Sequence, residues 1–302
     1  MRVVVSGASG FIGSQVARLL RSSGHAVMSL VGRRIAGFDL FTKNGRRLVT
    51  NTTRPEAFVH CAWCVDPKTY LTDLANVDHM RSTLELAEML DDAGCKRFIG
   101  LGSCLEYGIS CTADLEDRRK EGIYTKLSEG APLAPASLYA AMKLATGLAL
   151  TNTSYGGMKT AWARCFYVYG PGEHPSRLVP SVINKLSKNE EALCTSGKQV
   201  RDVLHVEDMA SAICAILESD LEGVVNVGSG TPVTVAEIAK MISGFLYKPK
   251  LVRLGALPDA LGHPEYRCAD NKRLLSTGWQ PKWSLGIGIA DTIDWWAKQK
   301  SP

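Results

Sequence analysis

Tyr139 and Lys143, in the stretch "LYAAMK", are the residues whose types and spacing first suggest chemistry. Residues 138–155 are rich in good helix formers, so the pair is expected on a helix, where positions four apart share a face. An ammonium beside a phenol lowers the pKa of the phenol, which can then exchange a proton with a substrate oxygen. A second donor must fix that oxygen, and Ser103, directly after the apolar run "RFIGLG", is the candidate.

A glycine-rich turn lies near the start of the chain. Residues 6–13 read "SGASGFIG" and fall between an expected strand and an expected helix. Glycine lets the backbone approach a pyrophosphate closely, and a helix N-terminus offers it N–H groups and positive partial charge. In this strand–turn–helix context the pattern predicts a dinucleotide site. The residues expected to contact the cofactor here are Gly7, Ser9, Gly10, Phe11, Ile12 and Gly13.

The end of the second expected strand, residues 25–32, indicates which dinucleotide binds. An NAD-specific site usually carries an acidic residue there, bonded to the ribose 2′-hydroxyl. This chain instead continues with Arg33 and Arg34. Two guanidinium groups suit a 2′-phosphate, so we expect NADP(H) rather than NAD(H). The simpler alternative is a pair of exposed loop arginines.

Strands and helices alternate through the first half of the chain, which predicts an α/β fold with a doubly wound parallel sheet. Residues 35–56 are polar and poorly patterned, and after Pro171 short helices alternate with short apolar runs. We therefore expect a dinucleotide-binding domain at 1–170, to which residues 203–230 return. A smaller C-terminal α/β annex, residues 171–202 and 231–302, is expected to bind substrate. The ligand should lie between the two parts, beyond the carboxyl ends of the strands.

Composition excludes several classes of function. The net charge of +5 is mild and its basic clusters are short, so nucleic acid is not an expected partner. No apolar run approaches the roughly 20 residues that cross a bilayer, and no signal-peptide pattern opens the chain, so we expect no membrane contact and a cytoplasmic location. The nine cysteines are then expected to be reduced thiols. Cys61 and Cys64 have no companion ligands at zinc spacing, so no metal is expected.

Several motifs together resemble the extended short-chain dehydrogenase/reductases, the nucleotide-sugar epimerase/dehydratase family, whose fold is Rossmann-type. The matching stretches, in chain order, are "GASGFIG", "FIGLGSCLEYG", "YAAMK", "ARCFYVYGPG", "VRDVLHVEDMASAI", "NVGSG" and "ADNKRLLSTGWQPKWSL". The resemblance implies that Ser103 and Tyr139 bind the substrate oxygen, with Tyr139 as acid/base, and that Lys143 binds the nicotinamide ribose. It also implies a homodimer formed through the helices expected near 72–92 and 137–155.

The resemblance implies further contacts. For the cofactor it adds Ala62, Asn76 and Phe166 to the residues above. For a nucleotide-diphosphate sugar it implies Cys104, Tyr167, Arg177 and Arg201, with Arg201 matching the arginine that binds the diphosphate. A second diphosphate arginine is not obvious; Arg267 is a possible substitute. The family's Gly-Asp-Leu is missing from residues 35–56, so the sequence does not assign the residues that bind the adenine ring.

Departures from the family pattern narrow the chemistry. The 4,6-dehydratases carry Asp-Glu where this chain has Cys104 and Leu105, and the double epimerases carry a histidine where it has Arg177. Two reactions remain: reduction of a nucleotide-linked 4-keto sugar by NADPH, which we favour, and 4-epimerisation with tightly bound NAD. The C-terminal half of this chain resembles the 4-ketoreductases of dideoxy-sugar pathways. A non-catalytic NADP-binding regulator is a further alternative, although such proteins tend to lose the serine, tyrosine or lysine that this chain keeps.

Overall fold

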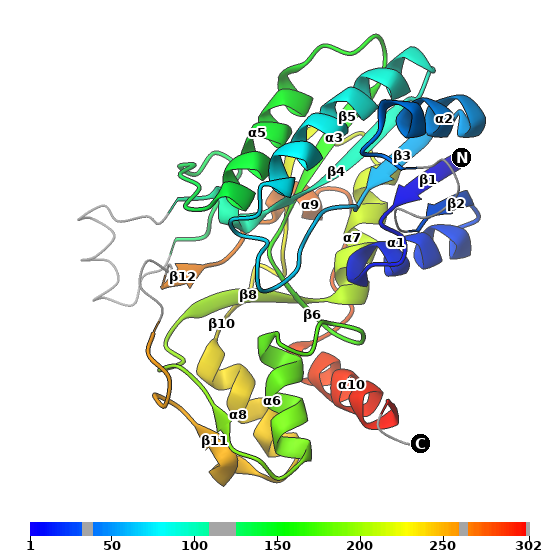
Figure 1. The fold of residues 1–302 in the computed structure, drawn as a ribbon. Coiled ribbons are helices and arrows are strands. Elements are labelled where there is room, and N and C mark those ends of the chain that lie inside the picture. Colours follow the sequence, from blue (N-terminus) through cyan, green and yellow to red (C-terminus); the bar gives the residue numbers. More distant parts are fainter. Residues whose placement is uncertain (32–38, 109–124, 260–264, 300–302) are drawn as a thin grey trace.

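The computed structural model describes residues 1–31, 39–108, 125–259 and 265–299. The larger of two lobes is built on a six-stranded parallel sheet (Figure 1). Its strands, in pairing order, are β2 (Ala26–Leu30), β1 (Arg2–Ser6), β3 (Ala57–His60), β4 (Arg97–Ser103), β5 (Lys159–Cys165) and β9 (Gly223–Val227). The parallel sheet with helices on both faces confirms the predicted fold class. Arg33 and Arg34 lie outside the described residues.

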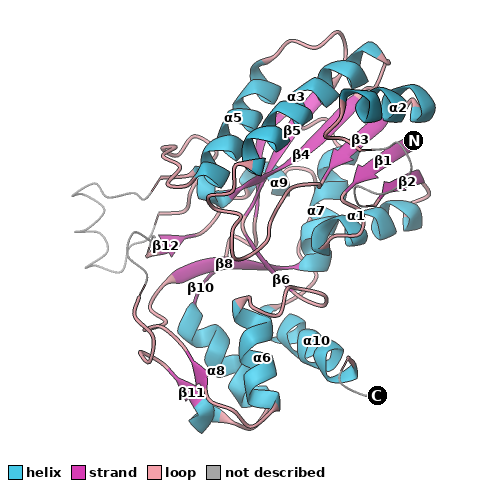
Figure 2. Ribbon diagram, viewed as in Figure 1, coloured by secondary structure: helices cyan, strands magenta, loops and turns pink. Residues whose placement is uncertain are grey.

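Helices cover both faces of this sheet (Figure 2). One face carries α1 (Phe11–Ser22) and α7 (Val206–Glu218); the other carries α2 (Lys43–Thr53), α3 (Ala75–Asp92) and α5 (Leu138–Asn152). Successive side chains of β1 point to opposite faces of the sheet, so this one strand contributes to the cores on both faces. Val3 and Val5 join the core beneath α1 and α7, whereas Val4 joins the core beneath α2, α3 and α5.

α2 is a helix that the sequence pattern did not indicate. Its buried residues are Gly45, Arg46, Val49 and Thr50, so only Val49 gives an apolar signal. The helix begins after Thr42, whose hydroxyl accepts a hydrogen bond from Gly45 N at 3.0 Å. Arg46 is anchored by a bond from Nη1 to Leu40 O at 2.7 Å and by an ion pair with Glu85 of α3. Tertiary contacts therefore hold a helix whose own periodicity is weak.

The smaller lobe has its own sheet and core. Its four strands are β6 (Tyr167–Tyr169), β8 (Val200–His205), β10 (Pro232–Thr234) and β12 (Tyr266–Arg267), and a separate pair is formed by β7 (Ala192–Leu193) and β11 (Val252–Arg253). Its helices α6 (Leu178–Ser187), α8 (Val235–Phe245) and α10 (Leu285–Lys298) share an apolar core. The short elements are α9 (Lys272–Leu275) and the 3-10 turns η1 (Cys104–Glu106) and η2 (Pro249–Leu251). None of the described helices is long and apolar enough to cross a membrane.

Candidate active site

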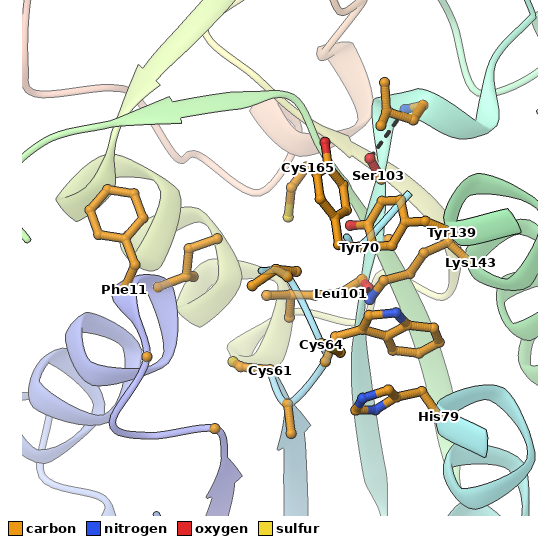
Figure 3. Close-up of a pocket in the computed structure, with 18 of the residues that line it drawn as sticks. Phe11, Cys61, Cys64, Tyr70, His79, Leu101, Ser103, Tyr139, Lys143 and Cys165 are labelled. Atoms are coloured by element: carbon orange, nitrogen blue, oxygen red, sulfur yellow. Dashed lines mark hydrogen bonds between the residues drawn. The ribbon is translucent and has the colours of Figure 1, made fainter. Parts of the chain in front are cut away.

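A cavity of about 1240 Å³ opens at the carboxyl ends of β1, β3, β4 and β5. Residues that follow these strands form most of its wall, and residues 166–168, Glu173, His174, Arg177 and Arg267 close it from the other side. In Figure 3, Ser103, Tyr139 and Lys143 lie together on one wall and Phe11 lies across from them. The carboxyl edge of a parallel sheet is the place where ligands bind in this architecture.

The glycine turn forms a backbone cradle at one end of the cavity. Gly7 has φ +67°, a conformation that L side chains rarely adopt, and its carbonyl accepts a bond from Gly10 N at 2.9 Å. A Cβ on Gly13 would lie 2.2 Å from Gly7 O. No side chain caps the N-terminus of α1, so its N–H groups are available to an anion. These features fit the pyrophosphate of a dinucleotide, and the predicted residues Gly7, Ser9, Gly10, Phe11, Ile12, Gly13 and Ala62 all line the cavity.

An aromatic cluster also lines the cavity, and the sequence pattern did not indicate it. Asp39, Leu40 and Phe41 line the cavity, although their segment showed no clear pattern. The Phe41 and His79 rings lie 4.5 Å apart and edge-on, and Trp63 stacks on His79 at 5.0 Å. Trp63 also lies 3.7 Å from Lys143 Nζ, so the cluster belongs to the wall that carries Lys143, across the cavity from Phe11 (Figure 3).

Ser103 ends β4 and caps η1. Its Oγ accepts a bond from Leu105 N at 3.2 Å, and its N–H donates to Glu106 Oε1 at 2.8 Å. Glu106 is fully buried and also accepts from Trp162 Nε1 at 2.9 Å and from Arg164 Nε at 2.6 Å. A charged network below the strand end therefore orients the serine that faces the cavity.

Tyr139 lies in the first turn of α5, because Ser137 caps that helix by accepting a bond from Ala140 N at 3.2 Å. The Tyr70 ring packs edge-on against Tyr139 at 5.0 Å. Burial raises the pKa of Tyr139 well above its usual value, and a hydrogen bond with Ser103 only partly opposes this. Loss of hydration thus outweighs the favourable interactions in the ligand-free protein, and a lowering of this pKa by Lys143 stays a prediction. The phenol is a proton donor at neutral pH.

Lys143 lies one turn further along α5, and its side chain is 4% exposed. Nζ donates to Leu101 O at 2.6 Å and lies 3.7 Å from the centroid of the Trp63 ring. Burial lowers the pKa of Lys143 to about 7, while the Glu106 carboxylate opposes the shift. The ammonium is thus held next to Tyr139 by a carbonyl and an aromatic face.

Most of the remaining predicted residues reach the cavity, but two do not. Phe166, Cys104, Tyr167 and Arg177 line it together with the catalytic candidates. Asn76 is 0% exposed and is not among the lining residues: its Oδ1 accepts from Trp63 Nε1 at 2.7 Å and its Nδ2 donates to Tyr70 O at 2.8 Å. Asn76 therefore supports the wall of the site through Trp63 and Tyr70, and its contact with the cofactor stays a prediction.

Arg201 is the second residue that lies outside the lining set. Its Nη1 donates to Val200 O at 2.9 Å, and its guanidinium lies 5.3 Å from the Tyr167 ring centroid. Arg267, on the neighbouring strand β12, does line the cavity, and its Nη1 is buried without a hydrogen-bond partner among the described residues. Arg201 and Arg267 are paired residues on the adjacent parallel strands β8 and β12. The sequence alone therefore allows either arginine to supply the positive charge for a diphosphate. The fold shows that Arg267 is the one that lines the cavity.

The model of the NAD dependent epimerase/dehydratase family matches residues 3–228 of the chain. The protein belongs to this family. This confirms the resemblance and the prediction of an NAD(P)-dependent enzyme of the short-chain dehydrogenase/reductase type. The family implies a nicotinamide dinucleotide as cofactor, in agreement with the backbone cradle at Gly7 and Gly13.

Relatives of this family member span nearly its whole length. It is 27% identical to the low-salt glycan biosynthesis protein Agl12 of Haloferax volcanii, with 98% of each chain covered. It is 28% identical to GDP-L-fucose synthase 1 of Arabidopsis thaliana, with 98% of this chain and 93% of the relative covered. UDP-glucose 4-epimerase of Thermus thermophilus, solved with NAD, has a TM-score of 0.83 and 25% identity, covering 98% of this chain and 99% of that one. UDP-glucose 4-epimerase of Thermotoga maritima, solved with UDP-glucose, has a TM-score of 0.87 at 23% identity over the full length of both chains.

Proposed function

We propose that the protein reduces a nucleotide-linked 4-keto sugar to the 4-hydroxy sugar, with NADPH as reductant. The observation that carries the proposal is the pairing of a protonated Tyr139 with Ser103 at the edge of a cavity that has a dinucleotide cradle at its other end. When bound, the reduced nicotinamide supplies a hydride to the carbonyl carbon.

The side chains would complete the reduction as follows. Ser103 and Tyr139 donate hydrogen bonds to the carbonyl oxygen, which fixes the keto group and polarises it. Tyr139 then transfers its proton to that oxygen as negative charge develops there. The Lys143 ammonium stabilises the resulting phenolate and offers a hydrogen bond to the nicotinamide ribose.

Two features of the cavity argue against two other reactions of the family, elimination of water and double epimerisation. The dehydratase acid and base positions are Cys104 and Leu105, and burial raises the pKa of the Cys104 thiol to about 11. Neither side chain exchanges a proton readily at neutral pH. Arg177, in place of the epimerising histidine, likewise stays charged and suits an anion better than proton transfer.

Substrate recognition in this proposal rests on Arg177 and Arg267, the two arginines among the described residues that line the cavity. A diphosphate brings about two negative charges and needs fixed cations of this kind. Arg33 and Arg34, which follow β2 in the sequence, support NADPH as the reductant.

The alternative function is 4-epimerisation with tightly bound NAD, favoured by the similarity to UDP-glucose 4-epimerase of Thermus thermophilus. Purified protein is to be incubated with a panel of 4-keto and 4-hydroxy sugar nucleotides while the absorbance of added NADPH is followed. The reductase proposal expects steady oxidation with a 4-keto substrate and a lower KM for NADPH than for NADH. Sugar conversion without net oxidation would support the epimerase instead, and equal KM values would contradict the choice of NADPH.

We also propose a homodimer. α3 and α5 lie side by side on one face of the sheet and expose Leu74 and Val77 near the start of α3 and Leu148 on α5, at 76%, 41% and 44%. Light scattering after size exclusion should give twice the chain mass, and Leu74→Glu combined with Leu148→Glu should give the monomer. A wild-type monomer at micromolar concentration would contradict the proposal.

A further inference from the structure

Glu173 is a half-buried acid in the cavity that the proposed mechanism does not use. It follows β6 in the loop "YGPGE", and it lines the cavity with Arg177. Its Oε2 is buried and has no hydrogen-bond partner among the described residues. Desolvation of such an oxygen costs free energy unless a partner is supplied, and buried polar atoms of this kind call for an explanation.

Contacts of its neighbours place the Glu173 loop between the reacting end of the cavity and the cofactor cradle. Arg177, four residues later, lies over the Tyr70 ring at 5.1 Å, and Tyr70 packs against Tyr139 at 5.0 Å. On its other side the loop approaches Phe11, since a Cβ on Gly172 would lie 4.0 Å from that ring. Glu173 thus belongs to the short segment of the smaller lobe that faces both Tyr139 and the cofactor cradle.

The charge state of Glu173 indicates what it can bind. Burial raises its pKa to about 8, against the opposing effect of the Arg177 guanidinium. His174, the other titratable group on this loop, is exposed and bonds to Ser176 at 2.8 Å. At neutral pH the Glu173 carboxyl is therefore uncharged and can both donate and accept a hydrogen bond. A neutral acid suits a hydroxyl or carbonyl oxygen of the sugar, whereas the phosphates suit the guanidinium groups of Arg177 and Arg267 and the backbone N–H groups of the glycine turn.

We propose that Glu173 is a specificity-determining residue that hydrogen-bonds the sugar ring of the substrate through its unpartnered carboxyl oxygen. This inference rests on the proposed function, because it requires a sugar nucleotide in the cavity. The sugar supplies the partner that Oε2 lacks in the free protein. Binding energy from this contact positions the sugar against Tyr139 without contacting the diphosphate.

Three variants separate this role from a purely structural one. Glu173→Gln keeps the shape and both hydrogen-bonding functions but cannot ionise, while Glu173→Leu keeps the volume and removes both functions. Glu190→Leu replaces an exposed carboxylate of the same lobe, paired with Lys185 at 2.6 Å, and serves as the control. Glu173→Leu also removes an unsatisfied polar atom, so its melting temperature should not fall.

Binding is measured by quenching of tryptophan fluorescence, with Trp63 in the cavity as the reporter, for UDP-glucose against UDP and for dTDP-glucose against dTDP. We expect Glu173→Leu to weaken binding of the sugar nucleotide on the order of ten-fold and to leave the bare diphosphate unchanged. Glu173→Gln should bind within about three-fold of wild type at pH 7. Between pH 7 and 9 the wild type should lose affinity for the sugar nucleotide, because the carboxyl ionises, and Glu173→Gln should not.

Equal effects of Glu173→Leu on the sugar nucleotide and the bare diphosphate would overturn the assignment, as would no effect on either. A change confined to NADPH binding would also overturn it, because it would place Glu173 at the cofactor. If the wild-type protein bound neither sugar nucleotide but did bind NADPH, the proposed function itself would be contradicted, and the inference would fall with it.

Discussion

Arg164 Nε donates a 2.6 Å hydrogen bond to Glu106 Oε2, and both side chains are almost completely buried below Ser103. The pair joins the end of β4 to β5 within the interior of the larger lobe. Replacing one member of a buried ion pair leaves an uncompensated charge, which typically costs 3–5 kcal/mol.

We therefore expect Glu106→Gln and Arg164→Met each to lower the free energy of unfolding by about 3–5 kcal/mol in urea denaturation. The double variant should lose less than the sum of the two, because no unpaired charge remains. The exposed pair Lys185 and Glu190 is the matched control, and its loss should change stability by less than about 1 kcal/mol. Additive losses at Glu106 and Arg164 would show that the pair is not coupled.

Removal of the Tyr139 hydroxyl tests acid catalysis. Tyr139→Phe keeps the ring contact with Tyr70 but cannot donate a proton, so turnover should fall by about two or more orders of magnitude. The melting temperature and the Kd for NADPH should change little. Tyr155→Phe, outside the cavity-lining set, is the control and should keep full turnover. Wild-type turnover in Tyr139→Phe would mean that another group delivers the proton.

The low pKa of Lys143 predicts a pH dependence for cofactor capture. The ammonium is present below about pH 7 and is lost as pH rises through that value, because burial disfavours the charged form. The kcat/KM for NADPH, which reports on groups of the free enzyme, should therefore decline on the alkaline side with an apparent pKa near 7. Tyr139 stays protonated over this range and does not contribute. A flat profile from pH 6 to 9 would contradict this role, and Lys143→Met should give a low, flat profile.

Close packing of Trp162 predicts that Gly147 tolerates no side chain. A Cβ at Gly147 would lie 2.5 Å from Trp162 Nε1, the atom that bonds to Glu106. Gly147→Ala should lower stability by about 1–3 kcal/mol through overpacking and reduce turnover by displacing the network below Ser103. The control is Gly244→Ala in α8, where no atom lies within 4 Å of the added Cβ. That change should be neutral or raise stability by up to about 1 kcal/mol, so equal losses in both variants would exclude packing as the cause.

Residue spacing along the sequence was sufficient to predict the parts of the site that are formed by residues close together in the chain. The glycine turn at 7–13 needs only a strand before it and a helix after it, and Tyr139 and Lys143 share a face because helical residues four apart always do. Ser103 is the last residue of a wholly buried strand, and the end of such a strand marks the ligand edge of a parallel sheet. Fold class and catalytic candidates could therefore be read from the chain alone.

Side-chain direction and burial depend on residues far apart in the sequence, and only the tertiary structure decided these. Asn76 turns to Trp63 and Tyr70, and Arg267 rather than Arg201 lines the cavity. α2 was missed because a single apolar residue anchors it, and the Phe41–His79–Trp63 stack joins three separate segments. The sequence determined which groups could do chemistry. Burial in the tertiary structure removes water from Tyr139, Lys143 and Glu173, and this decided the direction in which the pKa of each group shifts.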